Sequence, residues 1–245
     1  MNQCNVFANV SSIETMGLVD GPGIRVVIFL QGCNLRCAYC HNPDTWDMSA
    51  GEIRTVESIA NDILRYTRYI SGVTVSGGEP LLQMDFVIEL FKKVKSLGLS
   101  TCLDTSGIVF NRQDSNILSK FQELIKVCDI VMLDIKHIDE QSHISLTGKS
   151  NKNVLDFAMF LSENSVETWI RYVLVPGINS SENILKKTRE ILDNFKSVKK
   201  IEVLPYHRLG VEKYKKLGIE YQLSDIKEPT DDEIKLANLI LNKNN

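Results

Sequence analysis

Three cysteines lie within eight residues of the sequence, where Cys33, Cys37 and Cys40 form the pattern C-x-x-x-C-x-x-C. Thiolates are soft ligands that suit iron-sulfur clusters, and a short loop can place three of them around one face of a cubane. An ordinary electron-transfer cluster takes four cysteines, so three of them leave one iron open to another ligand. We therefore predict a 4Fe-4S cluster with three cysteine ligands.

The other chemistry open to these cysteines is a structural zinc site with His41 as the fourth ligand. Cys40 and His41 are adjacent, however, and no second ligand pair follows at the distance typical of zinc fingers. The remaining cysteines, Cys4, Cys102 and Cys128, are scattered along the chain. The spacing thus favours the cluster over zinc.

Short apolar segments alternate with amphipathic ones along the rest of the chain, which predicts strands alternating with helices. The expected strands are 24–30, 72–75, 99–103, 130–135, 168–175 and 200–204. The expected helices carry apolar stripes over 56–64, 87–94, 117–128, 154–161, 184–195 and 234–240. Because parallel neighbours need a crossover and a helix is the usual one, the alternation predicts one α/β domain over residues 1–245 with a parallel sheet. The pattern by itself does not separate an open sheet from a barrel.

Polar side chains gather just beyond the carboxyl ends of these strands, where parallel α/β folds place their sites. The cluster loop 33–40 follows the first strand. After the later strands come Gly77, Gly78 and Glu79; Asp104 and Thr105; Asp134 and Lys136; and Tyr206 and His207. Arg171 lies inside the fifth apolar segment, where a charge must face a polar cavity or meet a carboxylate. We expect all of these residues to serve one site.

Composition narrows the class of protein. The 245 residues are 43% hydrophobic, so we expect a full hydrophobic core. The formal net charge is -3, so the protein has no overall positive electrostatic field that would attract polyanions. No apolar run approaches the ~20 residues of a membrane span, and the N-terminus lacks the pattern of a signal peptide. We expect a cytoplasmic protein that binds neither membrane nor nucleic acid.

The cysteine spacing, with the aromatic Tyr39 before the last cysteine and the Ser76-Gly77-Gly78-Glu79-Pro80 turn, resembles the radical S-adenosylmethionine (SAM) superfamily. The resemblance implies a partial (β/α)6 TIM-like barrel. It also implies that the amino and carboxylate groups of SAM chelate the open iron. Glycines would let the backbone approach the ligand, and Glu79 offers a carboxylate to its amino group.

Further segments resemble the activating enzymes of glycyl-radical enzymes, and the pyruvate formate-lyase type in particular. They are 20–25, 40–42, 44–46, 102–105, 131–136, 169–173 and 204–207, and they span nearly the whole chain. The sequence has no ferredoxin-like insert after the cluster loop, unlike many other activases. Its length counts against the shorter activase of anaerobic ribonucleotide reductase.

This resemblance assigns roles to residues one by one. The expected SAM-binding residues are Tyr39, Cys40, His41, Gly77, Gly78, Glu79, Asp134, Ile135, Lys136 and His207. A monovalent cation is expected at Asp104, Thr105, Met132 and Asp134, and the protein substrate at Asp20, His41 and Arg171. Some have structural alternatives: Asp134 with Lys136 as a surface ion pair, His207 as a solvated loop residue, Asp104 as a tether of its own turn, and Arg171 as a member of a buried ion pair.

The implied reaction is the reductive cleavage of SAM at the cluster, after which the 5′-deoxyadenosyl radical removes hydrogen from a glycine of another protein. The implied partners are pyruvate formate-lyase and a flavodoxin or similar electron donor, and a monomer is expected. Three alternatives stay open: an activase of another glycyl-radical enzyme, a radical SAM enzyme acting on a small molecule, and a non-enzymatic iron-sulfur or zinc-binding module.

Overall fold

The computed structural model describes residues 6–242 of the chain. The internal contacts of the chain group into two compact units. The first unit comprises 6–34, 45–105 and 109–132, and the second comprises 35–44, 106–108 and 133–242 within the described residues. Each unit is described by itself, and the expectation of one domain over residues 1–245 stays a prediction.

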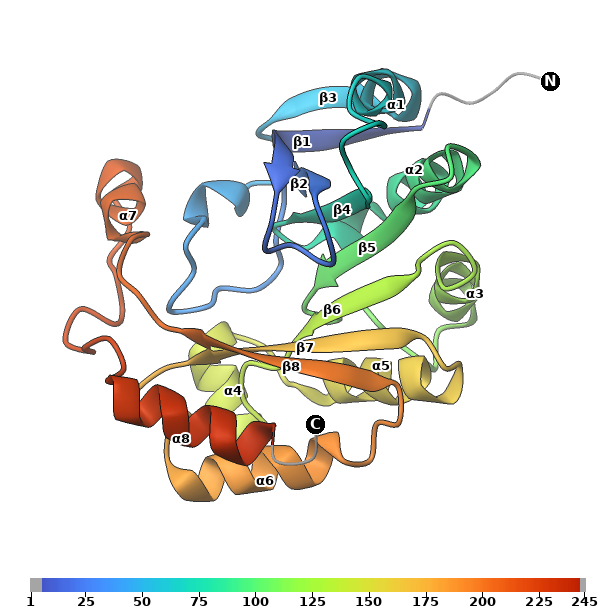
Figure 1. The fold of residues 1–245 in the computed structure, drawn as a ribbon. Coiled ribbons are helices and arrows are strands. Elements are labelled where there is room, and N and C mark those ends of the chain that lie inside the picture. Colours follow the sequence, from blue (N-terminus) through green and yellow to red (C-terminus); the bar gives the residue numbers. More distant parts are fainter. Residues whose placement is uncertain (1–5, 243–245) are drawn as a thin grey trace. The chain divides into compact units, whose positions relative to one another are not determined.

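The first unit is built around strands that follow one another as β3-β1-β2-β4-β5-β6. Their bounds are β1 Phe7–Gly17, β2 Arg25–Leu30, β3 Glu52–Thr55, β4 Gly72–Gly77, β5 Ser100–Thr105 and β6 Ile130–Asp134, the last two residues of which belong to the second unit. β2, β4 and β5 pair in parallel, as predicted, whereas β1 runs antiparallel to both β2 and β3. Figure 1 shows this arrangement in the blue and green part of the chain.

Strands β1 and β3 are absent from the sequence prediction. β1 mixes polar residues with single apolar ones, and only three of its eleven residues are buried. β3 has no buried residue. These two strands carry little of the apolar signal on which the prediction depended, because backbone hydrogen bonds stabilise them: β1 pairs with β2, and the edge strand β3 pairs with β1.

Three α-helices, α1 Val56–Leu64, α2 Met84–Ser96 and α3 Ser115–Leu124, and a 3-10 turn, Pro80–Gln83, complete the first unit. The hydroxyl of Thr55 caps α1 and the carboxylate of Asp114 caps α3, each by accepting an otherwise unpaired amide hydrogen bond. Helix α2 buries one apolar face, as its spacing predicts. The predicted stripe of α3 extended too far, since the helix ends at Leu124 and the buried Cys128 lies in the turn before β6.

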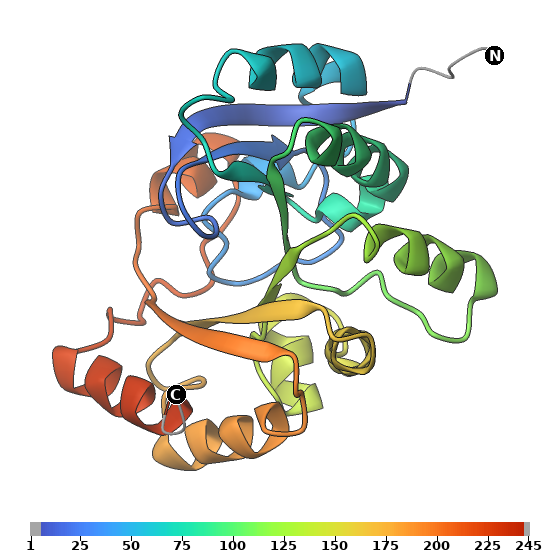
Figure 2. The same cartoon turned by 45° about the vertical axis from the view of Figure 1, so that its right-hand side comes forward.

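The second unit contains the end of β6 followed by β7 Glu167–Leu174 and β8 Val198–Pro205, which pair in parallel. Its helices are α4 Glu140–Thr147, α5 Lys152–Glu163, α6 Glu182–Leu192, α7 Val211–Leu217 and α8 Asp231–Leu241. Two views show α6 and α8 side by side on one face of the β7–β8 pair (Figures 1 and 2). That face carries the buried Ile170, Tyr172 and Leu174 of β7.

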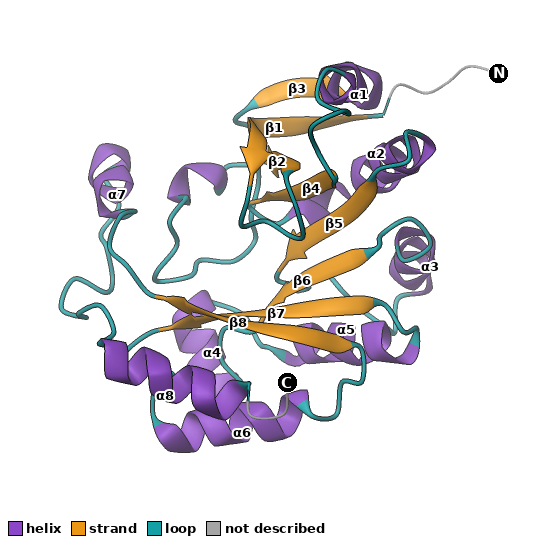
Figure 3. Cartoon of the chain, viewed as in Figure 1, coloured by secondary structure: helices purple, strands orange, loops and turns teal. Residues whose placement is uncertain are grey.

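Two helices of this unit, α4 and α7, are absent from the sequence prediction. The sequence of α4, EQSHISLT, has no apolar stripe; the Asp139 cap begins the helix and the left-handed Gly148 (φ +81°) ends it. Helix α7 has seven residues, three of them lysines, and it lies between two loops, apart from β7 and β8 (Figure 3). Local capping and contacts with a neighbouring loop define these two helices, so the spacing of apolar residues did not predict them.

All six predicted parallel strands are present, and the α/β class is confirmed. None of the helices among residues 6–242 is long and apolar enough to cross a membrane.

Candidate active site

The second unit holds residues 35–44, which include two of the three cysteines. The amide of Arg36 donates to the Thr147 carbonyl at 2.8 Å, and the amide of Ala38 donates to the Leu146 carbonyl at 2.9 Å. These acceptors are at the end of α4, where carbonyls have no partner inside the helix. The unpredicted helix therefore holds the loop that carries Cys37 and Cys40.

All described cysteines are reduced; Cys37 is buried, whereas Cys33 and Cys40 are partly exposed. No three His, Cys, Asp or Glu side chains converge on a single metal position among residues 6–242. A cubane does not require that, because each cysteine binds a different iron. Burial raises the pKa of Cys128 well above its usual value, so this thiol stays protonated and is a poor ligand.

The glycine turn of the first unit lies directly on the backbone that leads into the cysteine loop. The amide of Gly78 donates to the Leu30 carbonyl at 2.9 Å, and the amide of Glu79 donates to the Gly32 carbonyl at 2.8 Å. A Cβ atom at Gly78 would lie 2.2 Å from the Gly32 carbonyl oxygen and 3.1 Å from Cβ of Cys33. Only glycine fits at this position, so the turn fixes the start of the cysteine loop.

The carboxylate of Glu79 is buried, with 1% of the residue exposed. Its Oε1 accepts hydrogen bonds from the Thr105 hydroxyl at 2.5 Å and from the Leu81 amide at 3.1 Å. The neighbouring Asp104 accepts a hydrogen bond from the Ser76 hydroxyl at 2.7 Å. The structure thus brings together four side chains from the ends of β4 and β5, and it pairs Thr105 with Glu79.

In the second unit, Lys136 forms an ion pair with Asp134, with 2.9 Å between Nζ and Oδ2. The same ammonium lies 5.6 Å from the centre of the Tyr39 ring. Burial alone would lower the pKa of Lys136. The electrostatic effects of Asp134, Tyr39 and Cys37 together exceed that of burial, so the pKa of Lys136 is raised well above its usual value. Both Lys136 and Tyr39 are more than nine-tenths buried, so the pair with Asp134 is not a fully exposed surface ion pair.

Two further atoms of the second unit are buried without a hydrogen-bond partner among residues 6–242, namely the Tyr39 hydroxyl and Nδ1 of His207. Burial raises the pKa of Tyr39, which keeps its hydroxyl neutral and able to donate. Buried polar groups without partners are rare in folded proteins. They are positions at which a polar ligand would gain hydrogen bonds.

His41 and His207 stack, with their ring centres 3.9 Å apart and their planes at 21°. Nε2 of His41 lies 3.1 Å from the His207 carbonyl oxygen, which can only accept, so this nitrogen carries the hydrogen. Burial and the neighbouring His207 lower the pKa of His41. These contacts hold the two rings in place, and His207, whose Nδ1 is buried, is not a solvated loop residue.

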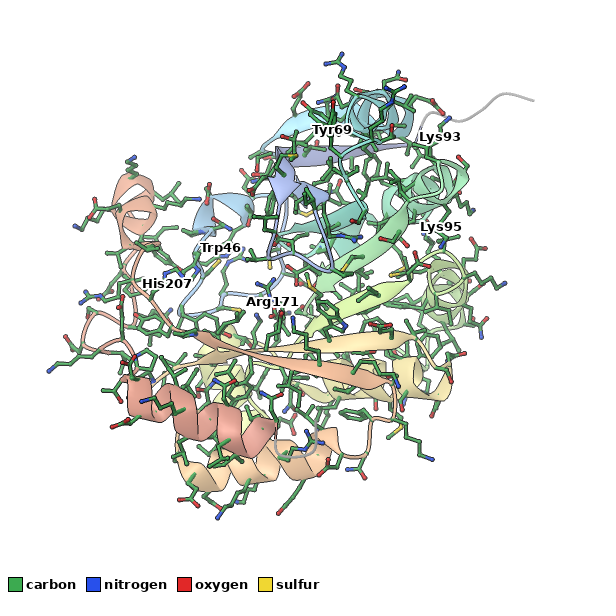
Figure 4. All side chains as sticks on the ribbon, viewed as in Figure 1. Trp46, Tyr69, Lys93, Lys95, Arg171 and His207 are labelled. Atoms are coloured by element: carbon green, nitrogen blue, oxygen red, sulfur yellow. The ribbon has the colours of Figure 1, made fainter. Side chains whose placement is uncertain are left out.

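Arg171 lies on the face of β7 opposite the buried residues, together with Trp169. In the parallel register, Arg171 is beside Glu202 and Trp169 is beside Lys200. Lys200 binds Glu202 at 2.5 Å and lies 4.3 Å from the centre of the Trp169 ring. This face of the β7–β8 pair is therefore charged and aromatic; Figure 4 labels Arg171 upon it. Sequence reasoning identified Arg171 but missed its three neighbours.

Asp20 lies in the loop before β2, and its carbonyl accepts a hydrogen bond from the Thr74 hydroxyl at 2.5 Å. Within the same loop segment, the fully buried guanidinium of Arg25 donates to Thr74 Oγ1, to the Val73 carbonyl and to Ser100 Oγ at 2.7 to 3.0 Å. The sequence named this segment as a motif without explaining Arg25. Its observed role is structural, because it ties the loop to the beginnings of β4 and β5.

Two remaining residues from the sequence prediction are in β6 or just after it. Met132 is buried in β6, and the amide of Ile135 donates to the Arg171 carbonyl at 3.0 Å. His137, which the sequence analysis did not single out, is also buried; its Nδ1 accepts from the Asp139 amide, and its Nε2 has no partner among the described residues. Only its position directly after Lys136 could have indicated it.

Comparison with known proteins identifies the family. Residues 19–155, more than half of the chain, match the family described as a 4Fe-4S single cluster domain. The chain is 49% identical over 243 residues to the pyruvate formate-lyase-activating enzyme of Staphylococcus epidermidis, covering 96% of each protein. The chain belongs to the pyruvate formate-lyase-activating enzyme family.

Solved structures support the fold of this family. A domain of a pyruvate formate-lyase-activating enzyme from Bacteroides vulgatus superposes with a TM-score of 0.58 at 23% identity, covering 71% of this chain and 94% of that one. Streptococcus suis SuiB bound to S-adenosylmethionine superposes with a TM-score of 0.63 at 16% identity, covering 87% of this chain and 46% of that one. The partial-barrel prediction is confirmed by this likeness to radical SAM folds.

The residues of the activating-enzyme family that are present here fit the cofactors that the family uses. Three reduced cysteines provide the soft donors for an iron-sulfur cluster. Gly77 and Gly78 leave no side chain between β4 and the loop that begins at Cys33. In the second unit, the buried Lys136 ammonium and the unpartnered atoms of Tyr39 and His207 offer donors to the oxygens of a nucleoside ligand.

Proposed function

We propose that this protein activates pyruvate formate-lyase by generating a glycyl radical on it, through the reductive cleavage of SAM at a 4Fe-4S cluster. The observation that carries this proposal is the near full-length 49% identity to an activating enzyme. It is supported by the three-cysteine loop, whose spacing leaves one iron without a protein ligand. When bound, the cluster supplies one electron and SAM supplies the alkyl group that becomes the hydrogen-abstracting species.

The chain's own residues bind and orient. Cys33, Cys37 and Cys40 hold the cluster, and the Gly77–Gly78 turn fixes where the cysteine loop begins. No side chain has to act as a general base, because the protein contributes position and a dry environment to chemistry that the cofactor carries out. Rigid positioning of the cysteines is therefore the main requirement on this part of the site.

In the second unit, we assign Tyr39, Cys40, His41, Asp134, Ile135, Lys136 and His207 to SAM. Lys136 is held charged by Asp134, so its ammonium can donate to a ligand carboxylate or hydroxyl. The stacked His41–His207 pair offers a flat surface with a buried ring nitrogen at its edge. Gly77, Gly78 and Glu79 complete the assignment from the first unit.

We assign the charged face of the β7–β8 pair to the protein substrate. Arg171 can donate to the carbonyls of an extended peptide, and Trp169 with Glu202 flank it in the register. Asp20 and His41 are the other residues assigned to the substrate. Pyruvate formate-lyase is the proposed partner, and other glycyl-radical enzymes are its competitors.

The finer features of the proposal are a monovalent cation at Asp104, Thr105, Met132 and Asp134, a flavodoxin-like electron donor, and a monomeric enzyme in the cytoplasm. Oxygen donors of the first unit suit a hard cation, although Asp104 and Thr105 already bind Ser76 and Glu79. Among the described cysteines outside the loop are Cys102 and Cys128, both buried, which supports an external source of electrons.

The test is anaerobic cleavage of SAM by reconstituted protein with dithionite, followed as release of 5′-deoxyadenosine. Cys37→Ala is expected to abolish cleavage and to lower the bound iron, because it removes a cluster ligand. The matched control is Cys128→Ala, which alters a buried, protonated thiol and is expected to retain iron and activity. Full cleavage by the Cys37→Ala protein would reject the proposed ligand set.

A further inference from the structure

The proposed reaction consumes one electron per SAM cleaved, and that electron must reach the cluster through the protein surface. Within the second unit, helix α7 begins beside the loop that carries Cys40. A Cβ atom at Gly210, just before α7, would lie 2.9 Å from Cα of His41 and 3.1 Å from the Cys40 carbonyl oxygen. The backbone of α7 thus begins in direct contact with the last cluster cysteine.

Two more contacts fasten α7 to the same loop. Nζ of Lys213 binds Asn42 at 2.8 Å and the Asp44 carboxylate at 3.1 Å. Tyr214 is buried beneath the helix, and its pKa is raised by burial and by the nearby Cys40 and Cys37. The outer side of α7 is therefore separated from Cys40 by about one helix diameter, ~10 Å.

The solvent side of this segment is both basic and apolar. Residues 208–219 contain four basic residues and one acidic residue, in a chain whose net charge is -3. Leu209 is 82% exposed, Leu217 47% and Ile219 37%. Besides Gly218, the exposed residues of this segment are Arg208, Leu209, Glu212, Lys215, Lys216, Leu217 and Ile219. We call the basic and apolar ones among them the α7 patch: Arg208, Leu209, Lys215, Lys216, Leu217 and Ile219.

The charge of the α7 patch is only partly neutralised. Lys215 binds Glu212 at 2.7 Å, whereas Lys216 has no ion pair within the described part of the chain. Exposed apolar residues beside an excess of basic charge, here three exposed basic residues against Glu212, are typical of a docking surface for an acidic protein. Such a surface also speeds encounter with that partner at low salt.

Another surface near the cysteine loop lacks this charge. A cavity of about 420 Å³ in the second unit is lined by neutral residues, among them Ala38, Leu146, Ile178 and Gln222. Ala38 follows Cys37 directly, so the cavity also approaches the cluster loop. With no charged residue in its lining, it offers no long-range attraction to a charged carrier, and the basic α7 patch is the better candidate.

We propose that the α7 patch is the docking surface for an acidic, low-potential one-electron carrier protein. The carrier gives up one electron, which the cluster gains, and no bond is made or broken at the patch. This inference rests on the proposed function, since it supplies the electron that the function needs. None of its residues is among those assigned to SAM or to the protein substrate, so docking can be changed separately.

The variant that tests the proposal is Lys215→Glu with Lys216→Glu. Its matched control is Lys186→Glu with Lys187→Glu in α6, because these are also adjacent exposed lysines and Lys186 binds Glu182 at the same 2.7 Å distance. The probe is flavodoxin held in its reduced form, and the readout is the rate of 5′-deoxyadenosine release. Each protein is also assayed with dithionite, which needs no docking surface.

With reduced flavodoxin at low salt, we expect the Lys215→Glu, Lys216→Glu protein to be slower by about tenfold or more. High salt should shrink that difference, because exposed charges are screened. Dithionite-driven cleavage and the α6 control should match the original protein, and Lys215→Arg with Lys216→Arg should restore the flavodoxin-driven rate.

Three outcomes would overturn the docking proposal: an unchanged flavodoxin-driven rate, an equal loss with dithionite, or a loss confined to dithionite-driven radical formation on pyruvate formate-lyase. The last would assign the patch to the protein substrate instead. These outcomes differ from a failure of the proposed function itself. In that case the unaltered protein would release no 5′-deoxyadenosine with dithionite.

Discussion

Arg25 shows how a single buried cation can organise a segment without taking part in chemistry. Its guanidinium is fully buried, and it donates to oxygen atoms of Thr74, Val73 and Ser100. Burial lowers the pKa of Arg25, although arginine remains charged at any ordinary pH. All three partners come from other strands, so their positions could not be deduced from the sequence around Arg25.

We predict that Arg25→Met lowers the free energy of unfolding by about 2–4 kcal/mol, because several buried acceptors lose their donor. Arg65→Met is the control, since that side chain is 75% exposed and its loss should cost less than about 0.5 kcal/mol. Urea unfolding at constant slope measures both values. Equal effects of the two changes would show that Arg25 is not an anchor.

Lys136 carries the clearest binding prediction at the residue scale. Its ammonium is buried, paired with Asp134 and placed over the Tyr39 ring. We expect Lys136→Met to weaken SAM binding by about tenfold or more, because a charge-assisted hydrogen bond is lost in a buried setting. Lys152→Met, at a lysine that is 74% exposed, should leave binding unchanged. Calorimetric titration of reconstituted protein would contradict the assignment if both variants bound SAM equally well.

At the scale of elements, most of the site was predictable because it follows the ends of apolar strands. The strands that lead to Cys33, Glu79, Asp104, Asp134 and His207 are all present with nearly the expected bounds. Helix α4, which holds the cysteine loop, was not predictable. Its carbonyls accept hydrogen bonds from amides of the loop, and such backbone contacts do not depend on residue type. Strand β1 and the edge strand β3 were missed for a similar reason.

Which side chains of the site contact one another could also not be predicted from the sequence. Glu79 was expected to serve the amino group of SAM, and the structure adds its contacts with Thr105 and the Leu81 amide. The stacking of His41 on His207 joins residues 166 positions apart. Such contacts depend on how strand ends come together in space, which spacing along the chain does not determine.

The turn between β4 and the Pro80–Gln83 helical turn supports a prediction at this scale. Gly78→Ala should lower the iron bound after reconstitution by at least about half, because a Cβ atom would collide with the Gly32 backbone and displace the start of the cysteine loop. Gly98→Ala is the control: Gly98 also turns the chain, with φ +74°, but nothing lies within 4 Å of its Cβ position. Iron analysis and circular dichroism distinguish loss of the loop from loss of the fold. Equal iron content in both variants would contradict the account.

At the scale of the whole molecule, the chain combines a net charge of -3 with a basic segment at 208–219. Composition gave the overall charge correctly but concealed this local excess, because acidic residues elsewhere outweigh it. The proposed function and the proposed docking surface call for two different protein partners, one that receives the radical and one that supplies the electron. The charged face of β7–β8 and the α7 patch are separate surfaces of the second unit that suit these two tasks.

The measurement that tests the central claim most directly is electron paramagnetic resonance of pyruvate formate-lyase incubated anaerobically with the reconstituted protein, SAM and dithionite. We predict a glycyl-radical signal that grows in step with released 5′-deoxyadenosine. Release of 5′-deoxyadenosine without that signal would keep the radical chemistry but reject this substrate. A fully loaded cluster that gives neither product would contradict the proposed function itself.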